Sequence, residues 1–132
     1  MEQEIMNEHE DKIIEAFIVK TKRERYKSLI ANPKKRGKFV QSLNHFQDLD
    51  ERYVTWLPSN APVEELLRGT GSPAEVYIVS ATETIDGEIL SLKEAIHRTM
   101  AGGWGTIISC IAGELAYYYD EVGERRALLQ RK

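Results

Sequence analysis

The chain has 132 residues, a length that fits one domain. Its 42% hydrophobic and 30% charged residues are typical of a globular protein and exclude collagen-like, mucin-like and wholly disordered classes. The 18 basic and 21 acidic side chains give a formal net charge of -3, which excludes a uniformly basic nucleic-acid coat.

The first third of the chain is expected to be helical, because its apolar residues recur at helical spacing in two stripes. The stripes are Ile13, Ile14, Phe17 and Ile18, and then Tyr26, Leu29 and Ile30. The first stripe predicts a helix over about 8–22. The second is rotated roughly 140° from it, at about 100° per residue. We therefore expect a break near Arg23–Arg25 or two different contact surfaces.

A further helix is predicted to start at Asn32-Pro33. Asparagine accepts hydrogen bonds from free amides, and proline suits the first helical position. The apolar stripe of this helix is Phe39, Val40, Leu43 and Phe46. Its opposite side carries Lys34, Lys38, Gln41 and His45. The helix is expected to end near residues 48–50.

The remainder of the chain is expected to alternate short strands with isolated helices. One helix follows Ser59–Pro62, and another follows the capping box Ser91–Glu94, in which serine and glutamate satisfy free amides reciprocally. Gly102-Gly103 ends the second. Residues 125–132 are either a strand or a terminal helix. The predicted strands are 53–56, 75–81, 88–90, 106–111 and 115–119.

These elements predict an α+β fold for a single domain over residues 1–132. Two or three helices over 1–47 are followed by a mixed portion over 53–132. That portion is expected to form a mostly antiparallel sheet of about four or five strands, with one or two intervening helices.

The sequence also predicts a cytoplasmic location. Cys110 is the single cysteine, so no intramolecular disulfide forms. The acidic start lacks the positive charge and apolar run of a secretory signal. No apolar stretch approaches the ~20 residues that span a bilayer, so no membrane partner is expected. No motif indicates a cofactor, and no ligand spacing indicates a metal.

Charge is segregated along the chain. Residues 1–11 carry -5, residues 12–38 carry +8 and residues 39–132 carry -6. A phosphate-rich partner needs several cations on one surface, so the middle segment is a candidate nucleic-acid or polyanion contact. The alternatives are a solvated helical face, or pairing with the acidic arm at 2–11 or with an acidic protein. The candidate binding residues are Lys20, Arg23, Lys27, Lys34, Lys35, Arg36, Lys38, Gln41 and His45.

A catalytic alternative rests on His45, Asp48 and Asp50, which are close in sequence. A histidine near carboxylates can bind a metal or act as a general base, so a metal-dependent hydrolase or nuclease is conceivable. The competing interpretation is that Asp48 caps a helix or closes a turn.

Several aromatic residues are candidate contacts, because exposed rings can stack on bases or anchor a protein interface. They are Trp104, Tyr117, Tyr118 and Tyr119. The competing interpretation of the tyrosines is that they are half-buried strand residues. Cys110, in an apolar strand, is expected to be structural rather than nucleophilic.

We therefore expect a small non-catalytic binding or regulatory protein that contacts a polyanion or an acidic protein through its basic helices. The hydrolase is one alternative. A self-associating protein that uses the two apolar stripes as an interface is the other.

Overall fold

The structure, a computed structural model, describes the backbone of residues 2–131 and the side chains of residues 8–131. It is an α+β fold, which confirms the fold class predicted from the sequence. Six strands form one antiparallel sheet in the spatial order β1-β6-β5-β4-β2-β3, so the predicted strand number was too low. The strands are β1 (Val54–Leu57), β2 (Glu75–Ser80), β3 (Ile89–Ser91), β4 (Thr106–Ile111), β5 (Leu115–Tyr119) and β6 (Arg126–Gln130).

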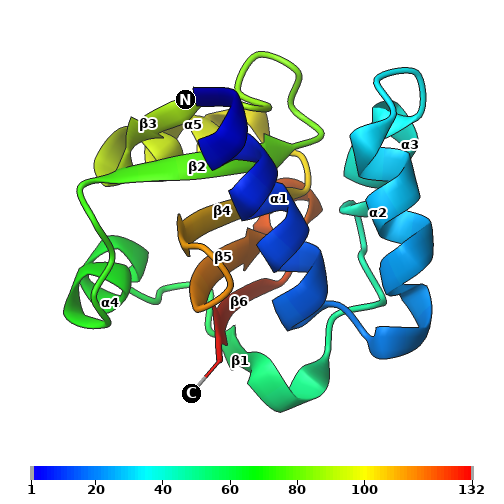
Figure 1. The fold of residues 1–132 in the computed structure, drawn as a ribbon. Helices are drawn as coiled ribbons and strands as arrows, with labels where there is room; N and C mark the ends of the chain where they lie inside the picture. Colours follow the sequence, from blue (N-terminus) through cyan, green and yellow to red (C-terminus); the bar gives the residue numbers. More distant parts are fainter. Residues whose placement is uncertain (1, 132) are drawn as a thin grey trace.

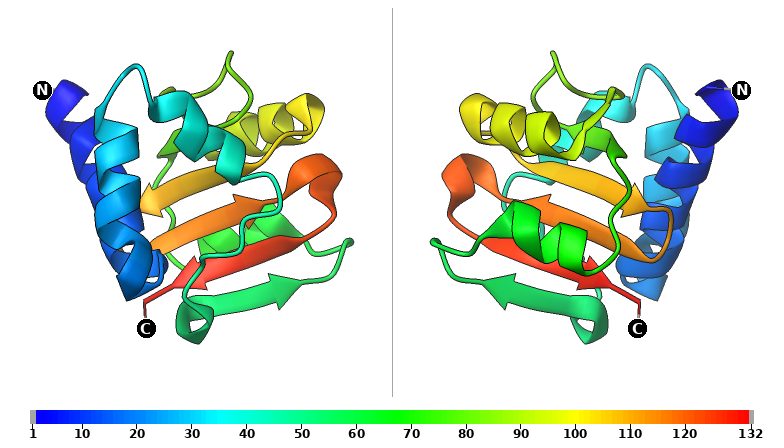
Figure 2. Two further views of the ribbon diagram at one scale, coloured as in Figure 1. Left: turned by 90° about the vertical axis from the view of Figure 1, so that its right-hand side faces the viewer. Right: turned by 90° about the vertical axis from the view of Figure 1, so that its left-hand side faces the viewer.

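Helices cover both faces of this sheet. α1, α2 and α3 pack on one face, and α4 and α5 pack on the other (Figures 1 and 2). None of the helices in the described range is long and apolar enough to cross a membrane. The helices are α1 (Glu2–Phe17), α2 (Arg23–Ala31), α3 (Arg36–Ser42), α4 (Val63–Gly69) and α5 (Leu92–Gly102).

Successive residues of the inner strands alternate between two hydrophobic cores, as side chains of a strand point to opposite faces. On β4, Ile107 lies in the core under α1–α3, whereas Ile108 lies in the core under α4 and α5. On β5, Tyr118 and Tyr117 divide in the same way. Because both faces are covered, these four residues are at most 1% exposed.

The break between α1 and α2 confirms the predicted interruption but comes earlier in the chain. Val19 donates its backbone N–H to Asp48 at 2.9 Å, and Asp50 donates to Phe17 at 2.8 Å. These bonds to a distant segment replace helical bonds, so α1 ends at Phe17. The predicted helix over 8–22 was wrong at both ends.

The two apolar stripes, although out of phase on one helix, enter the same core. The break re-aims α2, so that both helices present apolar residues to the sheet face that carries Tyr118. The core residues from the stripes are Ile13, Ile14, Phe17, Ile18, Tyr26 and Ile30, with Leu29 packed against them. The feature that suggested a dimer interface is thus buried within the chain.

α3 starts later than predicted. The Oδ1 atom of Asn32 accepts the N–H of Lys34 at 2.9 Å, and its carbonyl accepts the N–H groups of Lys35 and Arg36 at 2.8 Å. Asn32 therefore organises a turn, and α3 begins at Arg36. The predicted apolar stripe is buried, but α3 ends at Ser42.

The link between α5 and β4 requires glycine at two positions. Gly103 ends α5 with a φ of 76°, as predicted for a helix stop. Gly105 donates its N–H to Oδ1 of Asn44 at 2.6 Å and lies against the backbone of Leu43. A Cβ on Gly105 would lie 2.4 Å from the Leu43 carbonyl carbon, so the sheet and the end of α3 meet without room for a side chain.

We predict that Gly105→Ala lowers the free energy of unfolding by about 1–3 kcal/mol, because backbone atoms must shift to admit the methyl group. The control is Gly37→Ala, since a Cβ at Gly37 meets nothing within 4 Å. In that helical position alanine should stabilise by about 0.5–1 kcal/mol. Urea denaturation of both variants measures the difference, and equal effects would contradict the close approach.

Candidate functional site

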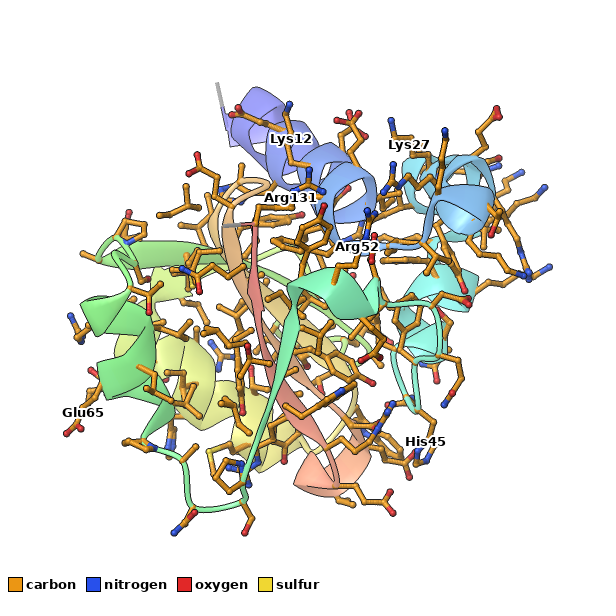
Figure 3. The ribbon with its side chains drawn as sticks, turned by 90° about the horizontal axis from the view of Figure 1, so that it is seen from below. Lys12, Lys27, His45, Arg52, Glu65 and Arg131 are labelled. Carbon is orange, nitrogen blue, oxygen red and sulfur yellow. The ribbon has the colours of Figure 1, made fainter. Side chains whose placement is uncertain are left out.

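The ten bases of the +8 segment do not form one continuous face. The break in the chain distributes them over α1, a 3-10 turn at Lys20–Lys22, α2 and the start of α3. Figure 3 shows Lys12 and Lys27 on the side formed by α1 and α2, with nitrogen-tipped side chains pointing outward around α2. The individual partners of these bases decide which of them remain available.

Three bases are held by groups of the same helical layer. Glu15 forms ion pairs with two lysines. Its carboxylate oxygens lie 2.7 Å from Nζ of Lys27 and 3.9 Å from Nζ of Lys12. The hydrogen bond from Lys27 holds the pKa of Glu15 below its ordinary value. Arg23 donates from Nε to the carbonyl of Ile18 at 2.8 Å. Glu15 therefore partly neutralises Lys12 and Lys27, whereas the bond to a carbonyl fixes Arg23 without neutralising it.

Arg36, one of the predicted binding residues, is held in an ion-pair network of low exposure. Its Nη1 lies 2.8 Å from Glu10, and its Nε lies 2.9 Å from Asp86. The side chain of Arg36 is only 22% exposed. The Tyr77 hydroxyl donates a hydrogen bond to the same Glu10. Arg36 therefore joins α1, α3 and the β2–β3 connection from within.

His9 extends this buried polar group and was missed at the level of sequence. Its Nδ1 lies 2.6 Å from Oγ of Ser109 on β4, and its ring stacks on Tyr77 at 5.5 Å. Burial lowers the pKa of His9 below its ordinary value. The available signal was the position of Glu10, which precedes Ile13 and Ile14 by three and four residues and so shares their face.

Within residues 12–38, the bases that are exposed and have no ion pair with a described side chain lie on α2 and its flanks. We call this set the basic surface. Its members are Lys20, Arg25, Lys34, Lys35 and Lys38. Gln41, also a candidate, is exposed on α3 beside this set.

His45 is separated from the basic surface, in contrast to its predicted place on the same helical side. It follows the end of α3 in a left-handed conformation with a φ of 61°. Its Nε2 lies 3.3 Å from Glu121, and its Nδ1 lies 3.7 Å from Asp120 and 3.8 Å from Glu124. Figure 3 shows His45 at a different corner of the molecule from Lys12 and Lys27.

The residues of the catalytic alternative have different partners. Asp48 accepts a hydrogen bond from the Tyr26 hydroxyl, and Asp50 accepts one from Arg52 at 2.7 Å. No hydrogen bond or ion pair between described side chains joins His45 to either carboxylate. Among the residues whose side chains are placed, no group of three or more His, Cys, Asp or Glu has the arrangement of a metal site.

Asp120 is the buried centre of the corner that holds His45. Only 1% exposed, it accepts hydrogen bonds from the N–H of His45 at 2.6 Å, the N–H of Glu121 at 2.7 Å and Nε of Arg125 at 3.1 Å. Burial alone would raise the pKa of Asp120, but these bonds outweigh it and lower that pKa. No local sequence pattern indicated this centre, because its partners come from the segment after α3 and from the β5–β6 connection.

The aromatic candidates divide by exposure. Trp104 is 48% exposed and stays a candidate contact. Tyr117, Tyr118 and Tyr119 are at most 4% exposed, so they are unavailable to a partner. The hydroxyl of Tyr118 instead donates to the carbonyl of Leu43 at 2.6 Å. The sequence suggested half-buried tyrosines in this hairpin. They are almost fully buried because helices cover both faces of the sheet.

Cys110 lies in the core, 3% exposed, as expected for a structural cysteine. Burial raises the pKa of its thiol to about 11. The nucleophilic thiolate is therefore scarce near neutral pH.

Comparison of the chain with protein-family models, with curated proteins and with solved structures gave no match.

We predict that Arg36→Met lowers the free energy of unfolding by about 3–5 kcal/mol, because it leaves Glu10 and Asp86 without their cation. Lys38→Met, two residues further on an exposed position, should change it by no more than about 0.5 kcal/mol. Chemical denaturation near pH 7 compares the two. If Arg36→Met lowers the free energy of unfolding no more than Lys38→Met does, the network has no structural role.

A second prediction concerns acid stability. Because the pKa of Asp120 is lowered by folding, its carboxylate stabilises the fold above the unfolded pKa of about 3.9, and this contribution is lost as pH falls through the folded pKa. Asp120→Asn should lower the free energy of unfolding by about 1.5–3 kcal/mol near pH 7. The difference from the wild type should shrink as pH falls below about 4. The exposed Glu124→Gln is the control, and a pH-independent difference for Asp120→Asn would contradict the charge effect.

Proposed function

We propose that this protein is a non-catalytic binding protein that holds the phosphate backbone of a nucleic acid on its basic surface. One observation carries the proposal. Three lysines within five positions, Lys34, Lys35 and Lys38, are exposed, and none forms an ion pair with a described side chain. They lie on the turn between α2 and α3 and on the first turn of α3.

The arrangement of this turn favours an extended anion over a small one. The turn lysines occupy one end of α2, and Arg25 lies near the other. A nine-residue helix is about 13 Å long, and one strand of a duplex places a phosphate about every 3.4 Å along the duplex axis, so the helix spans several phosphates. Phosphate contacts of this kind position a nucleic acid without reading its bases.

Arg36, which stands between Lys35 and Lys38 in the sequence, is bound to two acids, Glu10 and Asp86. Neither acid forms an ion pair with one of these lysines. An acidic protein would meet the same lysines, and the experiment below separates it from a nucleic acid.

The overall charge of -3 limits the strength of this binding. We expect weak, salt-dependent association that is confined to the basic surface. The partners of His45, Asp48 and Asp50 lend no support to the hydrolase alternative, and the burial of both apolar stripes removes the reason for the self-associating one.

We predict that a 20-nucleotide RNA and a 20-base-pair DNA bind at low salt, and that the affinity falls as salt rises. Lys34→Glu with Lys38→Glu should weaken binding at least tenfold, and the slope of log K against log salt should fall by about 2 units. Fluorescence anisotropy between about 20 and 200 mM salt measures both quantities.

The matched control is Lys93→Glu with Arg98→Glu on α5, on the opposite face of the sheet. It changes the net charge by the same amount. Equal weakening by both double variants would show a general charge effect and overturn the site. If neither nucleic acid binds at the lowest salt, the proposed function is overturned. An acidic protein would then be the remaining candidate partner of these lysines.

A further inference from the structure

A cavity of about 350 Å³ opens beside the edge strand β1, away from the basic surface. This volume is at the small end of the range of roughly 300–1,000 Å³ for small-molecule sites. The cavity lies where β1, β6 and the β5–β6 connection meet. Its lining residues are Glu51, Trp56, Leu57, Glu124, Arg125 and Arg126.

The lining carries two positive and two negative side chains that do not pair across the cavity. Among the described side chains, no nitrogen of Arg125 or Arg126 lies within 4.0 Å of a carboxylate oxygen of Glu51 or Glu124. A second cavity, beside α4, is different: there Arg68 and Glu64 pair directly at 2.7 Å. Opposite charges held apart around one space favour a molecule that bridges them.

Contacts with other residues hold the two arginines in place. Arg125 donates from Nε to Asp120 at 3.1 Å and from Nη2 to the carbonyl of Phe46 at 2.9 Å. Arg126 donates from Nη1 to the carbonyl of Ser59 at 3.1 Å. Nη1 of Arg125 has no hydrogen bond to a described group. The guanidinium of Arg126 lies instead 5.8 Å from the ring centroid of Tyr119, which belongs to the core under α4 and α5. Arg125 therefore keeps a nitrogen to donate to an anion while its position is fixed.

Trp56 supplies an apolar wall with a fixed orientation. Its indole Nε1 donates to Oε1 of Glu51 at 3.1 Å, and the guanidinium of Arg125 lies 4.7 Å from the ring centroid. The ring meets Tyr118 edge-on at 6.5 Å and is 39% exposed. The ring offers apolar contact to the body of a ligand whose charged ends meet the rim.

We infer that this cavity binds a small zwitterion of the α-amino acid class. Its carboxylate would accept a hydrogen bond from Arg125, and its ammonium group would donate to Glu51 and Glu124. An apolar side chain would rest against Trp56. A simple anion or cation satisfies only half of the lining, so both charges are needed for full affinity.

The test follows the Trp56 indole N–H in a ¹H–¹⁵N spectrum during titration with L-leucine. N-acetyl-L-leucine, which lacks the ammonium group, and L-leucinamide, which lacks the carboxylate, are the comparison probes. We expect a saturable shift with L-leucine and at least tenfold weaker binding of both derivatives. The Trp104 indole, outside the lining, should not move.

The variant Glu51→Gln with Glu124→Gln keeps the shape of the lining and removes its negative charge. It should bind L-leucine and N-acetyl-L-leucine equally, whereas Glu64→Gln with Glu65→Gln at the second cavity should keep the preference. No saturable shift with any probe, equal affinity of the wild type for all three, or a preference that survives in Glu51→Gln with Glu124→Gln would overturn the inference. None of these results depends on nucleic-acid binding.

Discussion

The ion-pair network of Arg36 is the constraint on which the rest of this structure depends. It joins Glu10 on α1 to Asp86 on the β2–β3 connection through the first residue of α3. Placing charges at low exposure costs free energy unless each is paired and hydrogen-bonded. This cost is offset only when all three elements are in place and their charges meet. Asp86 is fixed further by accepting the N–H of Ser80 at 2.9 Å. The helical layer therefore docks on the sheet in one orientation.

The same network borders the exposed lysines in the sequence. Arg36 binds two acids, whereas Lys34, Lys35 and Lys38 are exposed and form no ion pair with a described side chain. At the opposite corner, Asp120 has a similar role. It binds Arg125 from within, and Arg125 in turn lies over Trp56. In both places a paired charge of low exposure lies next to groups that we propose to meet a ligand.

Local patterns of the sequence predicted the elements that depend on local chemistry. The hairpin of β4 and β5, the Ser91 cap of α5 and the glycine stop at Gly103 all lie where expected. The patterns failed where distant contacts override local preference. Hydrogen bonds with residues 48–50 end the first helix at Phe17, and pairing with both β1 and β5 makes residues 126–130 a strand. The candidate site was the part least predictable from local patterns, because pairs such as Arg36 and Asp86 are 50 positions apart in the sequence.

The net charge of -3 consequently says little about what this protein binds. The +8 of residues 12–38 includes Arg36, which is internal, and Lys12 and Lys27, which share Glu15. The positive charge that remains available is concentrated at the α2–α3 turn. The cavity beside β1 is nearly balanced in charge and shares no residue with that turn. Because buried carboxylates fix the two regions separately, a change of surface charge in one should leave the geometry of the other intact.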